Sequence, residues 1–381
     1  MKEQHLFTPG PVDIPHEIRM AGAAPMVSHR SESWFGLLEE VGEHLERLLE
    51  VSGPVILIPG SGTGALEALA VNLLSPGDRV ISFSCGVFGE RFREIASRIG
   101  AEIIAVDIPR GRGFTGEDIR AALAKYPGAK AVLFTHNETS TGIVNPLEEM
   151  ASAVPEGGPL VLVDAVSSLG AMPCLPSKWG IDGVASCSQK GLLAPPGISP
   201  VWLSERAWET AKLRSCPSYY FDLAMHRKYL ENKRPQNPYT PPVSLYYSLS
   251  ASLQMLEECG WEKRFKSTAR LASTFETACE AMGLELFVRE KQFRSPALTS
   301  VIIPSGKGQT VKEALGVLGI IASEGQGEGD TCLRFAHYSP GGWPEVSLLA
   351  GSLFGAARDC GIDVDPGFIK EAWKTWNREG R

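Results

Sequence analysis

The chain has 381 residues, 43% of them hydrophobic, which is enough to bury one large core or two separate ones. Its formal net charge of −7 excludes a basic surface for nucleic acid spread over the whole sequence. No apolar run reaches the roughly 18 residues that indicate a membrane span, and the first residues lack the pattern of a secretory signal. We therefore expect a cytoplasmic protein without nucleic-acid or membrane partners. No set of His, Asp and Glu has metal-ligand spacing, so no metal is expected.

Short apolar runs alternate with helical patterns over the first two-thirds of the chain. The runs are rich in Val, Ile, Leu or Phe, which is typical of strands buried on both faces of a mostly parallel sheet. They cover residues 55–59, 79–84, 101–106, 130–135, 160–164, 183–186 and 200–203. Helices are expected between several of them, at 65–74, at 88–99 and after the N-cap residue Thr115. This alternation predicts a doubly wound α/β domain.

The pattern changes near residue 205. Residues 213–245 are rich in Pro, Tyr, Lys and Arg and predict an irregular crossing segment, and residues 248–282 predict a long helical stretch. Strands near 297–303 and 331–336 and a helix near 344–360 indicate a compact α+β domain. We therefore expect two unequal domains, a large one at 13–247 and a small one at 248–381 that includes the N-terminal arm 1–12.

Polar residues follow several of the predicted strands, where ligands bind in open α/β sheets. The glycine-rich segment 60–64, Gly-Ser-Gly-Thr-Gly, lies between a strand and a helix, as either a phosphate cradle or a tight turn does. It is no P-loop, because no Gly-Lys-Ser/Thr follows. Asp164 ends an apolar strand, where a carboxylate suits either a cationic ring nitrogen or a helix cap and salt bridge.

Two basic residues complete this set of features. Lys190 follows the strand at 183–186 and is either a nucleophilic amine of lowered pKa or a solvated surface group. Arg334 lies inside an apolar strand of the second domain, where a guanidinium either captures a carboxylate or joins a buried ion pair. A phosphate cradle, a pyridinium acid, a Schiff-base lysine and a carboxylate-binding arginine are together the working parts of an amino-acid enzyme that uses pyridoxal 5'-phosphate (PLP).

Ten motifs, spread over nearly the whole chain, carry a resemblance to a known family. They are Thr-Pro-Gly-Pro at 8–11, Ser-His-Arg-Ser at 28–31, Gly-Ser-Gly-Thr-Gly at 60–64, Gly-Val-Phe-Gly-Glu-Arg at 86–91, His-Asn-Glu-Thr-Ser-Thr-Gly at 136–142, Asp-Ala-Val-Ser-Ser at 164–168, Ser-Gln-Lys at 188–190, Pro-Pro-Gly at 195–197, Tyr-Thr-Pro-Pro-Val at 239–243 and Leu-Arg-Phe-Ala-His at 333–337. With these motifs the chain resembles the class V aminotransferases, and among them the alanine/serine–glyoxylate (serine–pyruvate) group. The resemblance implies PLP fold type I, with a large seven-stranded, mostly parallel sheet domain and a smaller C-terminal α+β domain.

The resemblance also implies a role for individual residues. Lys190 would form the Schiff base and shuttle a proton, and Asp164 would pair with the ring nitrogen. The other implied positions are Phe88 and Val166 on the two ring faces, Thr139 near the phenolic oxygen, Ser61, Gly62, Thr63 and Gln189 at the phosphate, and Arg334 with Gly10 at the substrate carboxylate. Thr240 would contact the phosphate across a dimer interface, which implies a homodimer with shared active sites.

The chain departs from the family pattern at a few positions. Many relatives carry tryptophan where Phe88 stands and histidine where Thr63 stands. The family's Gly-Gly-x-Gly loop before the carboxylate arginine begins here with Glu324 and ends with Gly327. We hypothesise that Glu324 narrows or charges the substrate pocket, against the alternative that its side chain turns to solvent.

The expected activity is ping-pong transamination from a small L-amino acid, serine or alanine, to a small 2-oxo acid, glyoxylate or pyruvate. The alternatives are an aminoalkylphosphonate aminotransferase, a cysteine desulfurase-like lyase and a non-catalytic PLP-binding protein. A desulfurase usually carries histidine where Gln189 precedes the lysine, and it needs a cysteine on a mobile loop, for which Cys332 is poorly placed. Against a mere binding protein, every position implied to be catalytic is filled.

Overall fold

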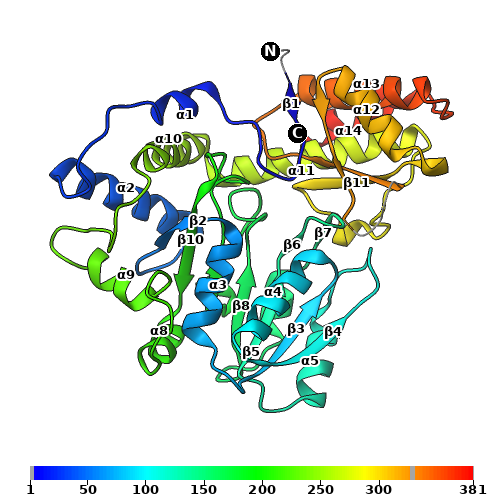
Figure 1. Ribbon diagram of the computed structural model, residues 1–381. Helices are drawn as coiled ribbons and strands as arrows, with labels where there is room; N and C mark the ends of the chain where they lie inside the picture. Colours follow the sequence, from blue (N-terminus) through cyan, green and yellow to red (C-terminus); the bar gives the residue numbers. More distant parts are fainter. Residues whose placement is uncertain (1–3, 327–330, 381) are drawn as a thin grey trace.

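The computed structural model describes residues 4–326 and 331–380, and it places a large sheet with its helices beside a smaller C-terminal region (Figure 1). Seven strands form the large sheet in the order β2-β10-β9-β8-β5-β3-β4. They are β2 (Ile56–Gly60), β3 (Arg79–Ser84), β4 (Glu102–Asp107), β5 (Ala131–Thr135), β8 (Leu160–Asp164), β9 (Gly183–Ala185) and β10 (Gly197–Leu203). Only β10 runs antiparallel to its neighbours in this sheet, so the expected mostly parallel, seven-stranded arrangement is confirmed.

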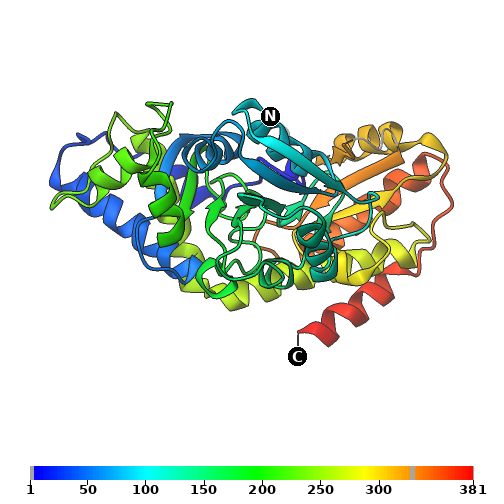
Figure 2. The ribbon, with the colours of Figure 1, turned by 90° about the horizontal axis from the view of Figure 1, so that it is seen from below.

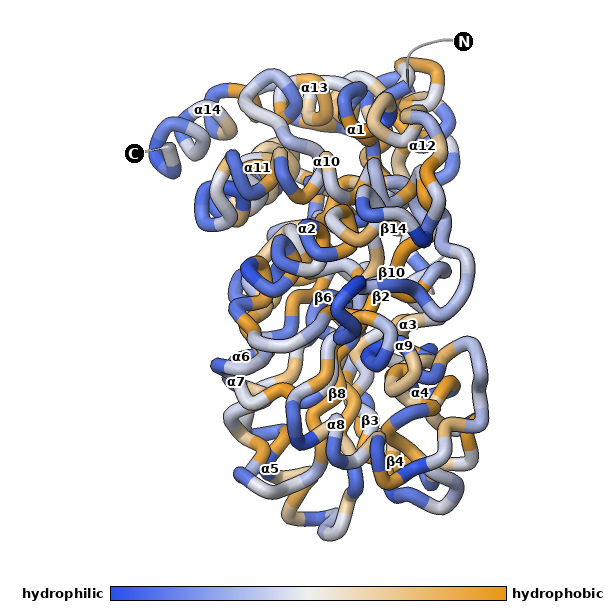
Figure 3. The backbone as a smooth tube through the Cα atoms, turned by 90° about the vertical axis from the view of Figure 1, so that its left-hand side faces the viewer, coloured by the Kyte–Doolittle hydropathy of each residue, from blue (hydrophilic) through white to orange (hydrophobic). Residues whose placement is uncertain are grey.

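Each face of the sheet is covered by its own apolar cluster. Successive residues of a strand point to opposite faces, and in β8 the side chains of Val161 and Val163 join one cluster while those of Leu160 and Leu162 join the other. Helices α2 (Glu32–Leu49) and α10 (Val243–Cys259) contribute to the first cluster, and α3 (Gly62–Leu73), α4 (Val87–Arg98) and α8 (Glu205–Lys212) to the second. Figure 3 shows hydrophobic residues gathered along strands such as β3 and β8.

The remaining helices connect and extend these layers. They are α1 (His16–Ala21), α5 (Gly116–Lys125), α6 (Leu147–Ser152), α7 (Pro176–Trp179), α9 (Leu223–Leu230), α11 (Trp261–Ala281), α12 (Gly308–Val317), α13 (Trp343–Asp359) and α14 (Phe368–Glu379). Thr115 caps α5 in a capping box, as its N-cap position predicted. The long helical stretch expected at 248–282 is two helices instead, because Gly260 has φ +87° and ends α10 there.

The C-terminal region has its own small sheet and core. Strands β11 (Leu298–Ile302), β14 (Cys332–Ala336) and β13 (Ser323–Glu324) pair antiparallel in that order and pack with α11, α12 and α13. Near the beginning of the chain, β1 (His5–Leu6) pairs in parallel with β12 (Ile320–Ile321) of the C-terminal region. Figure 2 shows this region, in orange and red, at one end of an elongated molecule.

The boundary between the two predicted domains falls inside a helix. The expected division at 247/248 lies within α10, and Leu249 and Leu253 of this helix pack in the core of the large sheet. The division stays a prediction, and we infer that it is better placed at Gly260, between α10 and α11. None of the helices in the described residues is long and apolar enough to cross a membrane. The cytoplasmic location expected from the sequence stays a prediction.

Candidate active site

Lys190 lies just past strand β9, against the N-terminal arm. Its Nζ donates a hydrogen bond to the carbonyl of Pro9. Gly10 is so close that a Cβ atom there would lie 2.6 Å from Lys190 Nζ, and its φ of +130° also requires glycine. Burial lowers the pKa of the Lys190 amine. The structure therefore brings together Gly10 and Lys190, and it gives the lysine the lowered basicity of a nucleophilic amine.

Asp164 ends β8 as a buried carboxylate with few partners. Its Oδ1 accepts a hydrogen bond from the amide of Val166, at 2.9 Å. Burial raises the pKa of Asp164 from 3.8 to about 7, while the Val166 amide and the positive charge of Lys190 oppose that rise. A protonated ring nitrogen would supply both the missing donor and a compensating charge. The carboxylate therefore fits a pyridinium partner.

The glycine-rich segment forms the beginning of helix α3. Ser61 is the N-cap residue, and its Oγ accepts a hydrogen bond from the Gly64 amide at 3.4 Å. A Cβ atom on Gly62 would lie 2.6 Å from Cγ2 of Val166, so only glycine lets this helix end approach so closely. Thr63 is exposed beside it. Free amides and partial positive charge at a helix N-terminus suit a phosphate group.

Gln189 adds a buried amide group that lacks a partner. Its Oε1 has no hydrogen-bond partner within the part of the chain that the structure describes. Rotation of the amide by a half turn would place the Nε2 donor in the same position. A buried polar atom without a partner is costly, and an added ligand group removes that cost. Gln189 therefore fits the phosphate contact that the sequence implies for it.

Phe88 lies in the first turn of α4 with its ring half-buried. The guanidinium of Arg91, one turn further along, stands over this ring at 4.8 Å from its centroid. The Phe88 side chain has no polar atom of its own, so it offers only an apolar ring face. Such a face suits stacking on a heteroaromatic cofactor.

Arg334 reaches the site from β14 of the C-terminal region. Its Nε donates to the carbonyl of Glu324 at 2.7 Å, and its Nη1 donates to the carbonyl of Thr139 at 2.6 Å. The side chain is buried, and burial lowers the pKa of its guanidinium. Among the described residues no acceptor is bonded to Nη2, so this end of the planar fork is left for a carboxylate. Thr139, itself buried, contributes its main chain here.

Glu324 contributes its main chain to the site, whereas its carboxylate lies elsewhere. In the β13–β14 pair, Ser323 stands opposite Arg334, and Glu324 stands opposite Leu333, which is buried in the C-terminal core. Neighbouring residues of a strand point to opposite faces, so the Glu324 side chain points away from the Arg334 guanidinium. Its carboxylate forms an ion pair with Lys312 of α12. The direction of this side chain gives no support to a narrowed pocket, although the negative charge of Glu324 is one of the smaller influences that raise the pKa of Arg334. Gly327 of the same loop lies outside the described residues.

Thr240 is exposed, in the segment before α10. The hydrogen bonds of the described residues do not connect it to the other candidate residues. Its neighbour Tyr239 stacks on Tyr220 with ring centroids 4.6 Å apart, and Tyr220 Oη donates to the Pro59 carbonyl just before the glycine-rich segment. The role across a dimer interface therefore stays a prediction.

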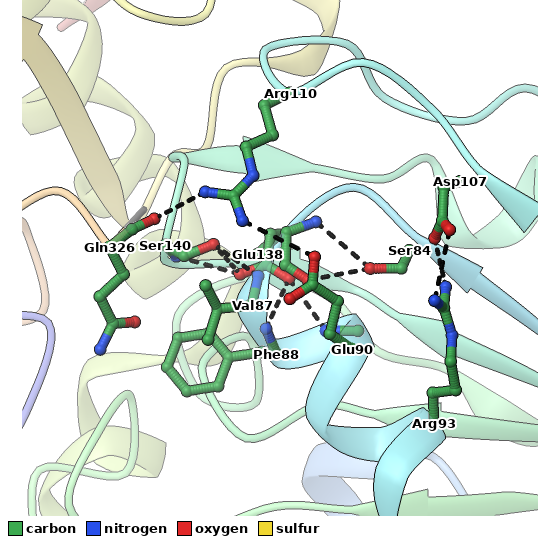
Figure 4. Close-up of polar contacts among 12 residues, drawn as sticks. Ser84, Val87, Phe88, Glu90, Arg93, Asp107, Arg110, Glu138, Ser140 and Gln326 are labelled. Carbon is green, nitrogen blue, oxygen red and sulfur yellow. Dashed lines mark hydrogen bonds and ion pairs between the residues drawn. The ribbon is translucent and has the colours of Figure 1, made fainter. Parts of the chain in front are cut away.

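One residue of the site was not singled out from the sequence. Glu138, 0% exposed, accepts hydrogen bonds from the amides of Phe88 and Gly89 in α4 (Figure 4). It lies three residues after the end of strand β5, whereas Asp164 is the last residue of β8, and an acid shortly after an apolar strand was the available signal. In the same view, Arg110 bridges Glu90 of α4 and the main chain of Gln326.

Comparison with known proteins shows the family of the chain. The model of the family described as "Aminotransferase class-V" matches residues 16–340. An uncharacterized aminotransferase of Methanocaldococcus jannaschii is 40% identical over 79% of this chain and 78% of its own length. The serine–glyoxylate aminotransferase of Methylorubrum extorquens is 31% identical over 98% of this chain and 96% of its own. The crystal structure of the alanine–glyoxylate aminotransferase of Nostoc sp. superposes with a TM-score of 0.88, at 32% identity over 93% of this chain and 96% of that one.

Proposed function

The chain belongs to the class V aminotransferases, PLP-dependent transaminases of fold type I, and we propose that it transfers the amino group of L-serine or L-alanine to glyoxylate or pyruvate by a ping-pong mechanism. The observation that carries the proposal is a half-buried lysine whose pKa is lowered by burial and by the positive charge of Arg334, an arginine whose guanidinium keeps one end open among the described residues. Relatives named for serine–glyoxylate and alanine–glyoxylate transfer support the choice of substrates.

The chemistry of transamination is divided between the cofactor and the chain. When bound, PLP supplies a carbonyl carbon that condenses with amino groups and a ring that withdraws electrons from the substrate α-carbon. Lys190 would take the proton from the substrate α-carbon through Nζ and deliver it to the former carbonyl carbon of the cofactor in one half-reaction, and it would reverse this transfer in the other. Its lowered pKa keeps a fraction of the amine neutral for this task. Asp164 holds the ring nitrogen in its protonated form.

The remaining residues orient the reactants. Arg334 binds the α-carboxylate through the free end of its guanidinium, while the carbonyls of Glu324 and Thr139 fix the other end. A small substrate with one carboxylate satisfies this single receptor. Phe88 and Val166 enclose the ring, and the N-terminus of α3 with Gln189 holds the phosphate.

We propose in addition that two copies of the chain form a homodimer in which Thr240 reaches the partner's phosphate site. Exposed aromatic side chains near Thr240 support a subunit contact there, since Tyr219 is 76% exposed and Tyr220 41% exposed. Within the described residues, Thr240 has no role in its own site. Analytical ultracentrifugation with and without PLP tests this, and a monomer at micromolar concentration would contradict it.

The alternative lyase activity gains no support from the second region. A desulfurase needs a reactive cysteine on an accessible loop, whereas Cys332 is 1% exposed inside β14. No specific feature of the described site favours a phosphonate donor over a carboxylate donor, because a guanidinium fork such as that of Arg334 suits both groups.

The experiment that tests the proposal is a visible absorption titration of the PLP-loaded chain with L-serine, L-alanine and other amino donors. We expect serine or alanine to bleach the cofactor band and glyoxylate or pyruvate to restore it, with the oxo product of the donor released. Lys190→Ala should bind PLP without completing this cycle. A band that no donor disturbs, or activity that survives Lys190→Ala, would overturn the proposal.

A further inference from the structure

The carboxylate of Glu138 accepts hydrogen bonds at both oxygens, and within residues 4–326 and 331–380 none of its donors is a charged side chain (Figure 4). Glu138 lies in β6 (Asn137–Glu138), which pairs with β7 (Ile143–Val144). Its Oε2 accepts from the amides of Phe88 and Gly89, each at 3.0 Å, and its Oε1 accepts from the amide and the hydroxyl of Ser140 at 3.0 and 2.5 Å. Burial raises the pKa of Glu138, and these four donors oppose that rise.

The first turn of α4 ends on this carboxylate. The Val87 amide donates to Ser140 Oγ at 3.0 Å, so the amides of residues 87, 88 and 89 all terminate on Glu138 and its partner Ser140. A helix leaves its first amides unsatisfied and carries partial positive charge at that end, which makes a carboxylate the strongest acceptor available. The approach is close, because a Cβ atom on Gly86 would lie 2.6 Å from Glu138 Cδ. The backbone that carries the Phe88 ring is therefore fixed by Glu138.

The same short segment also fixes the carboxylate receptor. Thr139 follows Glu138, and its carbonyl accepts from Arg334 Nη1 at 2.6 Å. The carbonyl of Glu138 in turn accepts from the Gly142 amide at 2.9 Å and closes the turn that follows. The position of the Thr139 carbonyl, and with it the orientation of the Arg334 fork, depends on how Glu138 is held.

We propose that Glu138 is a positioning residue that places two contact groups at once, the Phe88 ring face and the Arg334 carboxylate receptor. The inference rests on the proposed function, since it assigns Phe88 to the cofactor and Arg334 to the amino donor. A carboxylate that served only as a helix cap would stabilise the chain without setting the affinity for either ligand.

The test uses the full-length holoenzyme with four variants. Glu138→Gln keeps the size of the side chain but places an N–H donor against either the Phe88 and Gly89 amides or the two donors of Ser140. Glu138→Asp keeps the charge on a shorter side chain. Glu149→Gln is the matched control, because Glu149 also accepts from a helix-initial amide, that of Gly116 in α5, at 2.6 Å. Ser140→Ala removes one of the four donors and serves if Glu138→Gln does not fold.

Three quantities separate positioning from capping. They are the dissociation constant for PLP, the visible circular dichroism of the bound cofactor, and the dissociation constant for 2-methylalanine, an amino acid whose α-carbon carries no proton to transfer. Glu138→Gln should raise both dissociation constants by about tenfold or more, as expected for a lost hydrogen-bonded charge. It should also reduce the dichroic band. Glu138→Asp should recover part of both, Ser140→Ala should shift both by about threefold, and Glu149→Gln should leave both unchanged.

The outcomes that overturn the inference differ from those that overturn the function. If Glu138→Gln lowers the thermal midpoint but leaves both dissociation constants at the wild-type values, as Glu149→Gln does, Glu138 is a cap and no more. If the wild-type chain binds PLP and 2-methylalanine but transfers no amino group, the proposed function fails while the positioning role is still measured. Hydrogen exchange of the 84–92 peptide in the cofactor-free chain supplies a fourth readout, and unchanged exchange in Glu138→Gln would also contradict the inference.

Discussion

Two neighbouring strand ends each bury a carboxylate, and the two differ in how many donors they receive. Asp164 ends β8 and accepts from one amide, while Glu138 follows β5 and accepts from four donors in the described residues. The strands are adjacent in the sheet, with Thr135 paired to Asp164. Burial raises the pKa of both carboxyl groups. The Asp164 carboxylate, which receives one hydrogen bond from the protein, can still accept one from a ligand. The Glu138 carboxylate, whose two oxygens already accept four hydrogen bonds, instead fixes the backbone that donates to it.

Replacement of Asp164 should give the largest effect on catalysis. Asp164→Asn keeps the shape of the side chain but removes the charge that stabilises a protonated ring nitrogen, so we expect kcat to fall by about 10³-fold. Steady-state kinetics measures the change, and far-ultraviolet circular dichroism confirms that the variant folds. A kcat within tenfold of wild type would contradict the proposal that Asp164 keeps the ring nitrogen protonated.

Unfolding of the cofactor-free chain should then show opposite signs for the two carboxylates. Glu138→Gln leaves buried donors facing an amide, and we expect the free energy of unfolding to fall by about 2 kcal/mol. Asp164→Asn removes an ionisable group that burial disfavours in its charged form, so at pH 8 we expect a gain instead. Denaturant unfolding followed by tryptophan fluorescence measures both. A loss of stability in both variants would mean that Asp164 is also a structural group.

The pH dependence of stability sharpens the same contrast. The pKa of Asp164 is 3.8 ordinarily and about 7 in the folded chain, so the folded state binds the proton more tightly than the unfolded state. Its contribution to stability is therefore complete below pH 4 and is lost as pH rises from about 4 to about 7. The midpoint of thermal unfolding in wild type minus that in Asp164→Asn should decline across this window in the cofactor-free chain, and a difference independent of pH would contradict the prediction.

A third carboxylate gives the smallest expected effect. Glu324 is ion-paired with Lys312 on the face opposite to Arg334 and is partly exposed, so we expect a substrate to feel its charge only weakly, as the Arg334 guanidinium does. Glu324→Gly should change kcat/KM by about threefold or less and should leave the ranking of amino donors unchanged. A reordered ranking would restore the hypothesis that this side chain charges the pocket.

The large sheet was predictable from the sequence because each buried strand is a local apolar run. All seven strands were expected close to their observed bounds, and the capping box of Thr115 follows from local chemistry. The break at Gly260 was missed, because the residues on both sides keep a helical pattern and only the positive φ of one glycine separates the two helices. Local patterns specify elements better than they specify where one element ends.

The contacts between segments that are distant in the chain were harder to predict from the sequence. The role of Glu138 depends on amides of α4 such as that of Phe88, which lies 50 residues earlier in the chain, and nothing in the local sequence shows that these amides meet its carboxylate. The direction of the Glu324 side chain depends on the register between β13 and β14, where a shift of one residue would reverse it. Lys190 and Arg334 were singled out because a lysine shortly after a buried strand and an arginine inside an apolar strand are uncommon, and their roles stay predictions.

The N-terminal arm has a practical consequence for handling the protein. Strand β1 is hydrogen-bonded to the C-terminal region through β12, and within a few residues the same arm accepts a hydrogen bond from Lys190 at Pro9. A purification tag or fusion partner attached before His5 would adjoin a segment that contacts the proposed catalytic lysine, so it can displace that segment. The other terminus ends in α14, which packs on α11, so an extension after this helix leaves the arm untouched.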